Sequence, residues 1–288
     1  MTWRRRFRGA SAGYLLIAPA LAATVLFLVI PMVISAYWSL THYNGIKPPE
    51  FVGLQNYLDV LGNARFQKAF ENTIAFVILG MGIGPALGLG SALLLDRALR
   101  LRGLFRSAFF LPTMTSLVVV ATIWKFLYSD AGIINAVLGL FGLPGVNWLS
   151  DTTTALPAVV VTSIWQGFGF ETVVFLAALQ SIPRNYYEAA SIDGAGRWAK
   201  FRWVTLPGLR PTILFVYVIG IIGSFQTYDQ IFVMTNGGPI QATRTIVFDL
   251  VDRFNRLDLG GASAVAYILV VFLAVLSYLQ LRIGEERD

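Results

Sequence analysis

The sequence contains no cysteine and only one histidine, His42, among its 288 residues. The absence of cysteine excludes disulfide scaffolds, iron–sulfur clusters and thiol catalysis, and it leaves no trace of the redox state of the compartment. A single histidine cannot build a multi-histidine metal site. The chain therefore lacks the residue types on which much metal and thiol chemistry depends.

Charged side chains are also scarce, since Asp, Glu, Lys and Arg make up 13% of the chain, against about 25% in average soluble domains. So few charges could not cover the outside of a soluble core of this size. Apolar residues reach 56% and aromatic residues 14%, which excludes a disordered chain. These proportions indicate a membrane protein, and the net charge of +6 is not read as a nucleic-acid footprint.

Six long stretches carry at most one charged residue each. A bilayer core about 30 Å thick needs roughly 20 helical residues to cross. The stretches lack the period-2 alternation of barrel strands, and their prolines do not exclude helices, because neighbouring helices satisfy the freed carbonyl groups. We therefore predict an all-α polytopic membrane protein with six transmembrane helices, at Tyr14–Leu40, Asn72–Leu95, Ser107 to about Trp124, Leu156–Leu179, Pro211–Met234 and Leu259–Leu281.

Basic residues fall mostly on one side of these spans. Fifteen lie in the two termini and in the loops after the second and fourth spans, six lie on the opposite side, and Lys125 lies at the outer end of the third span. The positive-inside rule then places both termini in the cytoplasm. The first run is longer than the 7–15 residues of a signal-peptide core, so it is expected to be an anchor. The expected division is a cytoplasmic segment 1–13, a transmembrane domain 14–283 that includes a cytoplasmic loop 181–210, and a tail 284–288.

The cytoplasmic loop 181–210 is longer than the others. Its pattern predicts a short helix over Arg184–Asp193, with Gly194 as its C-terminal stop. A second amphipathic stretch, Arg197–Leu206, is expected at the membrane surface and to end at Pro207.

The first helix of this loop is unusual for a connector. Ala189 and Ala190 make one side slim enough to enter a groove, and Glu188 places one negative charge beside them. Spacing alone leaves two interpretations open. The helix either completes the loop at the membrane surface or docks onto a cytoplasmic partner.

Three short motifs follow one another in this loop: Glu188–Ala190, Asp193–Ala195 and Leu206-Pro207. Together they resemble the EAA loop of permease subunits of binding-protein-dependent ABC importers. The flanking Leu179–Pro183 and the downstream Thr235–Pro239 sharpen the resemblance to the carbohydrate-uptake class, which includes the maltose and glycerol-3-phosphate permeases. The resemblance runs from the first span to the C-terminus and implies the type I ABC importer permease fold.

By this resemblance, the helix around Glu188 is a coupling helix that sits in a cleft of an ATPase subunit. Glu188 would pair with a basic residue of that ATPase, and Gly194 would permit the bend to the next helix. The residues that the resemblance assigns to coupling are Tyr187, Glu188, Ala189, Ala190, Ile192, Asp193 and Gly194.

The chain has no Gly-x-x-x-x-Gly-Lys-[Ser/Thr] phosphate loop. We therefore expect it to be no enzyme and to bind no cofactor, with ATP and magnesium on partner subunits. The resemblance implies two ATPase subunits, a second homologous permease and an extracytoplasmic solute-binding protein in a bacterial or archaeal cell membrane. The expected solute is a sugar or a polyol-like molecule, and no nucleic-acid partner is expected.

Glu171 is an acid inside the fourth run, about 14 Å from its cytoplasmic end at 1.5 Å per residue. Ionisable groups inside a bilayer are costly, and transport sites lie near its midplane. We predict that Glu171 contacts substrate; the alternative is a structural carboxylate paired with Lys125 or with an arginine. Its neighbours add aromatic faces and an amide to the predicted pathway: Trp165, Gln166, Gly167 and Phe170.

Small and polar residues recur at spacings of three and four along the fifth run. Such a stripe is either part of a substrate pathway or a seam where helices approach closely, and both interpretations stay open. The resemblance places substrate-lining positions on this stripe and on Gly167 and Phe170. The predicted stripe comprises Gly220, Gly223, Ser224, Thr227 and Tyr228.

Three further features each have two interpretations. Asp229, about 27 Å along a continuous helix from Pro211, is expected to mark a helix end more than a binding site. The glycines of the second run favour a packing seam over a hinge. The turn Gly237-Gly238-Pro239 either contacts an external binding protein or is a plain turn.

A secondary transporter driven by an ion gradient is the alternative function. It would require internal inverted repeats and paired acids inside the membrane. The sequence shows neither, since only Glu171 and the peripheral Asp229 lie within the spans.

Overall fold

The computed structural model describes residues 16–96 and 102–285, which are mostly helical. They form two compact units. The first comprises residues up to 62 together with 250–268, and the second comprises 63–249 together with the residues from 269 onward. The expected cytoplasmic segment 1–13 and the last residues of the tail, 286–288, lie outside the described residues.

The first unit begins with the N-terminal membrane helix, Leu16–Ser39, which is long and apolar enough to cross a bilayer. The unit also holds a short antiparallel hairpin, in which Thr41 pairs with Phe51 and His42 with Glu50. The elements of this unit are η1 (Val25–Val29), α2 (Ile30–Ser39), β1 (Thr41–His42), β2 (Glu50–Phe51), α3 (Gln55–Gly62), the end of α13 (Ile246–Asn255) and the start of α14 (Leu259–Glu285).

Polar contacts fix the C-terminal end of the first helix. The buried Asn56 side chain donates hydrogen bonds to the carbonyl oxygens of Ser39 and Thr41, at 2.9 and 2.8 Å. The Ser35 hydroxyl donates to Ser263 of α14 at 3.2 Å. Backbone groups that a strand or helix leaves open here are therefore satisfied by side chains.

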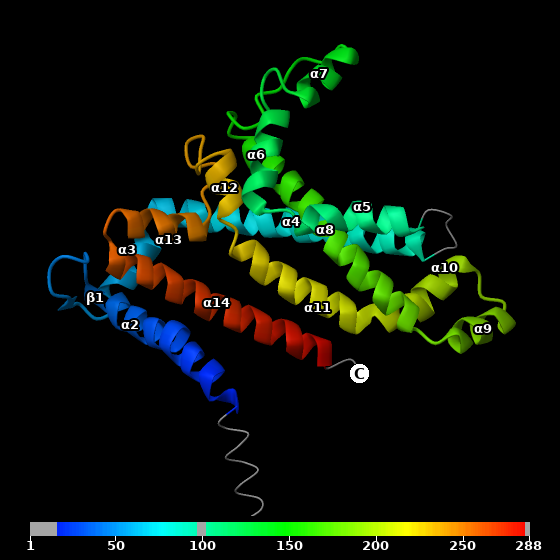
Figure 1. The fold of residues 1–288 in the computed structure, drawn as a ribbon, viewed down its shortest axis with the longest axis horizontal. Coiled ribbons are helices and arrows are strands. Elements are labelled where there is room, and N and C mark those ends of the chain that lie inside the picture. The colour runs from blue at the N-terminus through cyan, green and yellow to red at the C-terminus, as the bar shows by residue number, and fades with distance from the viewer. Residues whose placement is uncertain (1–15, 97–101, 286–288) are drawn as a thin grey trace, which may run out of the picture. The chain divides into compact units, whose positions relative to one another are not determined.

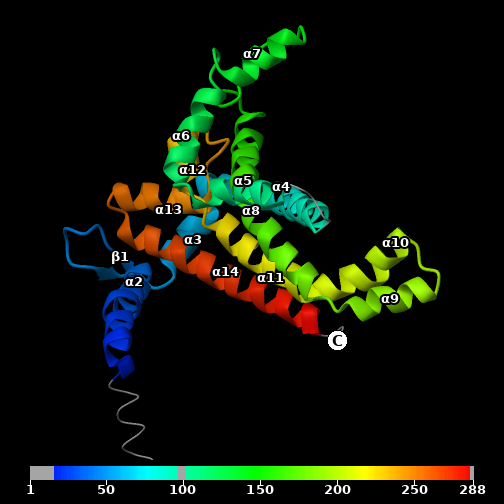
Figure 2. The same cartoon turned by 45° about the vertical axis from the view of Figure 1, so that its right-hand side comes forward.

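The second unit is built around two long helices, α4 (Ala64–Leu95) and α8 (Ala155–Ser181), which pack along each other. α11 (Leu206–Phe225) packs against both (Figure 1). Figures 1 and 2 show α9 and α10 at one end of α8 and α11, and α12 at the other end of α11. The shorter elements are α5 (Arg102–Met114), α6 (Leu117–Leu127), α7 (Ile133–Leu140), α9 (Arg184–Ile192), α10 (Arg197–Lys200), η2 (Phe201–Thr205) and α12 (Asp229–Met234).

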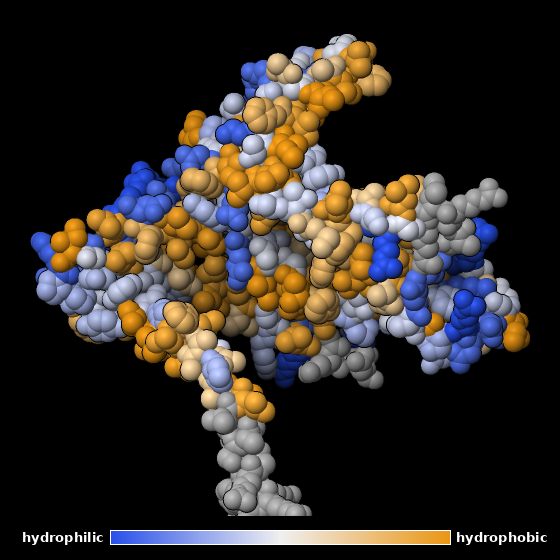
Figure 3. All heavy atoms as spheres, in the orientation of Figure 1, coloured by the Kyte–Doolittle hydropathy of each residue, from blue (hydrophilic) through white to orange (hydrophobic). Residues whose placement is uncertain are grey.

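Two apolar clusters hold this unit together. One lies toward α9 and is centred on Phe175, Leu209 and Val216. The other surrounds Phe76 and Val159 and includes residues of α12. The outward faces of the same helices are apolar as well, and in Figure 3 hydrophilic residues gather at the α9–α10 end. Apolar residues both inside and outside are what helices in lipid require.

The number of spans agrees with the sequence. Within residues 16–96 and 102–285, five helices are long and apolar enough to cross a membrane, and the bent pair α5–α6 makes a sixth if it counts as one span. The predicted second and fourth spans are confirmed as helices, although α4 begins eight residues earlier, at Ala64 instead of Asn72. The absence of charge therefore located the membrane core correctly, while amphipathic helix ends extended past it.

The third predicted span is not a single helix. α5 and α6 meet at Thr115–Ser116 with a bend of 100°. The Gln166 side chain of α8 donates to the Thr115 carbonyl at 3.2 Å, and the Thr113 hydroxyl donates to the Gln166 carbonyl at 2.9 Å. Irregular backbone at membrane depth is tolerated where protein groups satisfy it, which explains how this break persists.

Two predictions are wrong here: the fifth span, Pro211–Met234, is not one helix, and the amphipathic stretch before it does not end at Pro207. The helix ends at Phe225, and a new helix, α12, begins at Asp229. The expected distance from Pro211 to Asp229, which assumed one continuous helix, therefore does not apply. The expected stop at Pro207 is absent, because one helix runs from Arg197 to Phe225. Pro207 lies two residues after the end of the π-helical η2 and in the first turn of α11, where a proline is tolerated.

Candidate functional site

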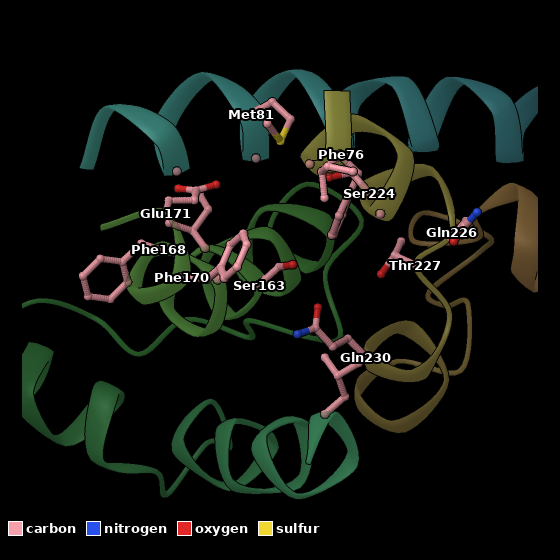
Figure 4. A pocket seen from close by; sticks show the side chains of 18 of the residues that line it. Phe76, Met81, Ser163, Phe168, Phe170, Glu171, Ser224, Gln226, Thr227 and Gln230 are labelled. Carbon is pink, nitrogen blue, oxygen red and sulfur yellow. The ribbon is translucent and has the colours of Figure 1, made fainter. Parts of the chain in front are cut away.

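A cavity of about 400 Å³ lies in the second unit, between α4, α8, α11 and α12, with the α5–α6 break at its side. Figure 4 shows Met81 of α4 facing the side chains of Glu171 and Phe170 of α8, with Ser224 of α11 beside them. Pockets of 300–1,000 Å³ with a few polar groups on mostly apolar walls suit small ligands. The cavity therefore has the size and composition of a solute site.

The structure brings eight of the ten predicted pathway residues to this cavity. They come from two segments far apart in sequence, α8 on one hand and α11 with its connection to α12 on the other. Their contact with substrate stays a prediction. They are Gly167, Phe170, Glu171, Gly220, Gly223, Ser224, Thr227 and Tyr228.

The other two predicted residues, Trp165 and Gln166, do not line the cavity. Trp165 packs edge-on against Trp124 of α6, with ring centroids 5.5 Å apart. Gln166 is buried and forms part of a structural junction. The sequence grouped both with Glu171 by proximity along the chain, but a helix turns adjacent residues to different faces.

The junction around Gln166 connects three elements. Its Oε1 accepts a 2.9 Å hydrogen bond from Nε2 of Gln230 in α12, and its Nε2 donates to Thr115 at the α5–α6 break. Gln166 and Gln230 are 7% and 2% exposed, so their amide groups hydrogen-bond to each other in place of water. This pair holds one wall of the cavity in place.

Gln230→Leu is expected to lower the stability of the detergent-solubilised protein by about 1–3 kcal/mol, because it leaves a buried amide oxygen of Gln166 without a donor. Thermal unfolding of the purified protein measures the effect. The double variant Gln166→Leu/Gln230→Leu should be more stable than Gln230→Leu alone, because it also removes the amide oxygen that the single variant leaves without a donor. A single variant as stable as the parent would show that the pair does not hold the wall.

Several cavity residues were missed by the sequence. Gly80, Met81 and Gly84 of α4 form one wall, and Asp229 lines the cavity although it also begins α12. The signal in α4 was the row of glycines, for which the sequence favoured a packing seam over a hinge. Other lining residues without a sequence signal are Phe76, Thr113, Leu117, Ser163, Ile164, Phe168, Val216, Ile219, Gln226 and Gln230.

The glycines of α4 divide into two groups. A Cβ added at Gly88 would lie 2.7 Å from the Cβ of Glu171, and one at Gly84 would lie 3.3 Å from its Oε2. These two glycines form the packing seam that the sequence favoured. At Gly80, Gly82 and Gly90 no described residue lies within 4 Å of an added Cβ, so the seam does not extend to them.

The predicted coupling helix is α9, which ends one residue before the predicted Asp193. Its residues divide between two sides. Tyr187 and Ala190 are half-buried, and the Tyr187 hydroxyl is 3.0 Å from the Thr205 hydroxyl of η2. Glu188, Ala189 and Ile192 are exposed, and Ile192 is 86% exposed. α9 is thus anchored to its own chain on one side and presents a free face on the other.

α9 ends just before the glycine stop that the sequence indicated, Gly194. Gly194 has φ +76°, in the left-handed region that glycine adopts without strain. The amide of Ala195 donates to the Ala190 carbonyl at 2.8 Å, which closes the helix with a backbone cap. Asp193 and Gly194 are exposed beside the free face.

The turn Gly237-Gly238-Pro239 is only partly accessible. Gly237 is buried against the ring of Phe248, and Gly238 accepts a 2.8 Å hydrogen bond from the Thr243 hydroxyl. The next residue, Ile240, is 88% exposed. Any contact of this turn with another protein would therefore use its Pro239–Ile240 end and not Gly237.

The helical spans and the central cavity define a multi-pass membrane transport protein. The family of binding-protein-dependent transport system inner membrane components matches residues 84–286. The chain belongs to this family, and it is the membrane-spanning permease component of an ABC importer. This membership decides against the ion-gradient-driven alternative.

Curated relatives match over nearly the whole length of both chains. The trehalose/maltose transport system permease protein MalF of Thermococcus litoralis is 33% identical over 100% of this chain and 98% of its own. The lactose transport system permease protein LacF of Rhizobium radiobacter is 34% identical over 96% and 94%. The sn-glycerol-3-phosphate permease protein UgpA of Pectobacterium atrosepticum is 33% identical over 98% and 96%.

Solved structures agree in fold. A chain of a bacterial alginate ABC transporter, crystallised in complex with a periplasmic protein bound to an alginate pentasaccharide, superposes with a TM-score of 0.87 at 22% identity. The match covers 99% of this chain and 98% of that one. The all-α architecture predicted from the sequence, including its type I importer layout, is thereby confirmed.

Proposed function

We propose that this permease passes a sugar or a polyol-like solute through the cavity between α4, α8 and α11. An extracytoplasmic binding protein delivers the solute, and a second homologous permease completes the pathway. Two cytoplasmic ATPase subunits bind ATP and magnesium and drive the transport. Both termini of the chain face the cytoplasm in a bacterial or archaeal cell membrane.

The observation that carries this proposal is the composition of the cavity. Small residues on α11 leave it open, and aromatic, amide, hydroxyl and carboxylate groups share its walls. Aromatic faces pack on the apolar faces of sugar rings, while the polar groups accept and donate hydrogen bonds to hydroxyl groups. The names of the relatives for trehalose, maltose and lactose transport support the same solute class.

The free face of α9 supports the coupling part of the proposal. An exposed carboxylate, a small alanine and an apolar Ile192 lie on it, which suits insertion into a cleft of another protein. The Tyr187–Thr205 contact connects α9 to the helix that continues into α11. A displacement of α9 would therefore move a wall of the cavity.

Gly223→Trp is the variant that tests the solute route. Gly223 lines the cavity, and an added Cβ there meets nothing within 4 Å in the part of the chain that the structure describes, so an indole fits only by filling the open space. We expect uptake to fall at least about tenfold in vesicles that contain the complete transporter. The assay measures uptake of maltose, trehalose, lactose and sn-glycerol-3-phosphate, each with its binding protein.

Gly90→Trp is the matched control, because Gly90 is also open but lies on α4 away from the cavity. It should transport as the parent does. Unchanged uptake by Gly223→Trp would contradict the route, and no uptake of any of the four solutes by the parent would contradict the sugar assignment.

A further inference from the structure

Glu171 has an unusual environment within the cavity. Its side chain occupies the space left by Gly84 and Gly88 on α4, and Figure 4 shows its carboxylate turned toward that helix. Its Oε2 is shielded from solvent and has no hydrogen-bond partner in the described parts of the chain. An acceptor in this position costs free energy unless a donor reaches it.

No basic residue neutralises this acid from the cavity walls. Among the described residues that line the cavity, Glu171 and Asp229 are the ionisable acids, and none is Lys, Arg or His. Lys125, the partner considered from the sequence, donates to the Val233 carbonyl at 3.1 Å instead. Walls of low dielectric concentrate the field of such charges within a cleft.

We propose that Glu171 selects solutes by charge, so that this cavity takes neutral and amino sugars and disfavours uronic acids and sugar phosphates. A hydroxyl or ammonium group of the solute donates to the Glu171 carboxylate from the cavity side. An anionic solute places a second negative charge beside it and loses affinity. This inference deepens the proposed function and rests on the cavity being the solute route.

Because the chain contains no cysteine, a single introduced thiol can report the electrostatic field in the cavity. In Ser224→Cys, a single thiol lies in the cavity wall, and in Ile240→Cys a single thiol lies at the exposed turn. Both purified, detergent-solubilised proteins are treated with two methanethiosulfonate reagents of similar size, one carrying a trimethylammonium group and one a sulfonate. Each rate is divided by the rate of that reagent with mercaptoethanol.

The cation-to-anion rate ratio should be at least about tenfold higher for the thiol at position 224 than for the thiol at position 240. Adding Glu171→Gln should lower the ratio at position 224 at least about fivefold and leave it unchanged at position 240. In a second arm, D-glucosamine and D-glucose should protect the thiol at position 224 better than D-glucuronate. This preference should weaken in the Glu171→Gln background.

An equal ratio at the two positions, a ratio insensitive to Glu171→Gln, or a thiol at position 224 that no reagent reaches would each overturn charge selection. The outcome is separate from the test of the route. If Gly223→Trp blocks uptake while the cation-to-anion rate ratio is equal at positions 224 and 240, only charge selection is contradicted. If Gly223→Trp transports normally, the proposed function fails whatever the ratio.

Discussion

Glu188→Lys is expected to reduce solute uptake at least about 30-fold while the amount of permease in the membrane stays at the parental level. Glu188 is exposed on the free face of α9, so the replacement leaves the buried packing of the described residues unchanged. Docked in an ATPase cleft, however, the carboxylate would face a basic residue, and reversing its charge buries two like charges together. Breaking one buried charge pair costs about 2–5 kcal/mol, and about 2 kcal/mol corresponds to the 30-fold loss.

Glu71→Lys is the control for the change in net charge. Glu71 is an exposed acid near the start of α4, and its ion pair with Lys68 is solvent-exposed and contributes little. Uptake by this variant should match the parent. Parental uptake by Glu188→Lys, measured with labelled solute in vesicles at equal permease levels, would remove Glu188 from the coupling surface.

Gly169→Ala is expected to destabilise the second unit by about 2 kcal/mol or more. A methyl group at Gly169 would overlap the backbone carbonyl oxygen of Phe109, so α5 and α8 must separate to admit it. Backbone cannot rotate away as a flexible side chain can, and overpacking of a tight contact costs about 1–3 kcal/mol or more. The fraction of protein in the folded peak of gel filtration, together with its thermal unfolding, measures the loss.

Gly167→Ala on the same helix provides the comparison. An added Cβ at Gly167 meets none of the described residues within 4 Å, and alanine favours a helix over glycine by about 1 kcal/mol. This variant should be as stable as the parent or more so. Equal stability of the two variants would show that α5 and α8 do not approach as closely as the structure places them.

The sequence located the membrane-spanning core well, because charge is excluded from lipid and its absence is visible in one chain. It did not reveal the break between α5 and α6 or the one between α11 and α12. The stretch around Thr115–Ser116 is as free of charge as a straight span, and what stabilises its 100° bend is the side chain of Gln166 from another helix. A single sequence does not show such pairings between distant segments.

The cavity was predicted only in part, because a single sequence does not show which distant segments lie together. Spacing along α11 identified its small residues, since a helix brings positions three and four apart to one face. The α4 glycines were assigned mainly to packing, which holds for Gly84 and Gly88 against Glu171, but the sequence did not show that Gly80, Met81 and Gly84 line the cavity. On α9, the motif identified the segment, but only the fold shows that Tyr187 anchors the helix while Glu188 is free.

The most direct test of the account is a crosslink from α9 in the assembled transporter. Because the chain lacks cysteine, Ala189→Cys places a single thiol on the free face of α9, and Ile240→Cys places one at the distant exposed turn. A photoreactive crosslinker on the thiol at position 189 should join the permease to a polypeptide that binds ATP, in a yield that changes when ATP is added, whereas the same crosslinker at position 240 should not. Absence of an ATP-binding polypeptide from the crosslinked products of the Ala189→Cys variant would contradict the claim that this helix receives the driving force for transport.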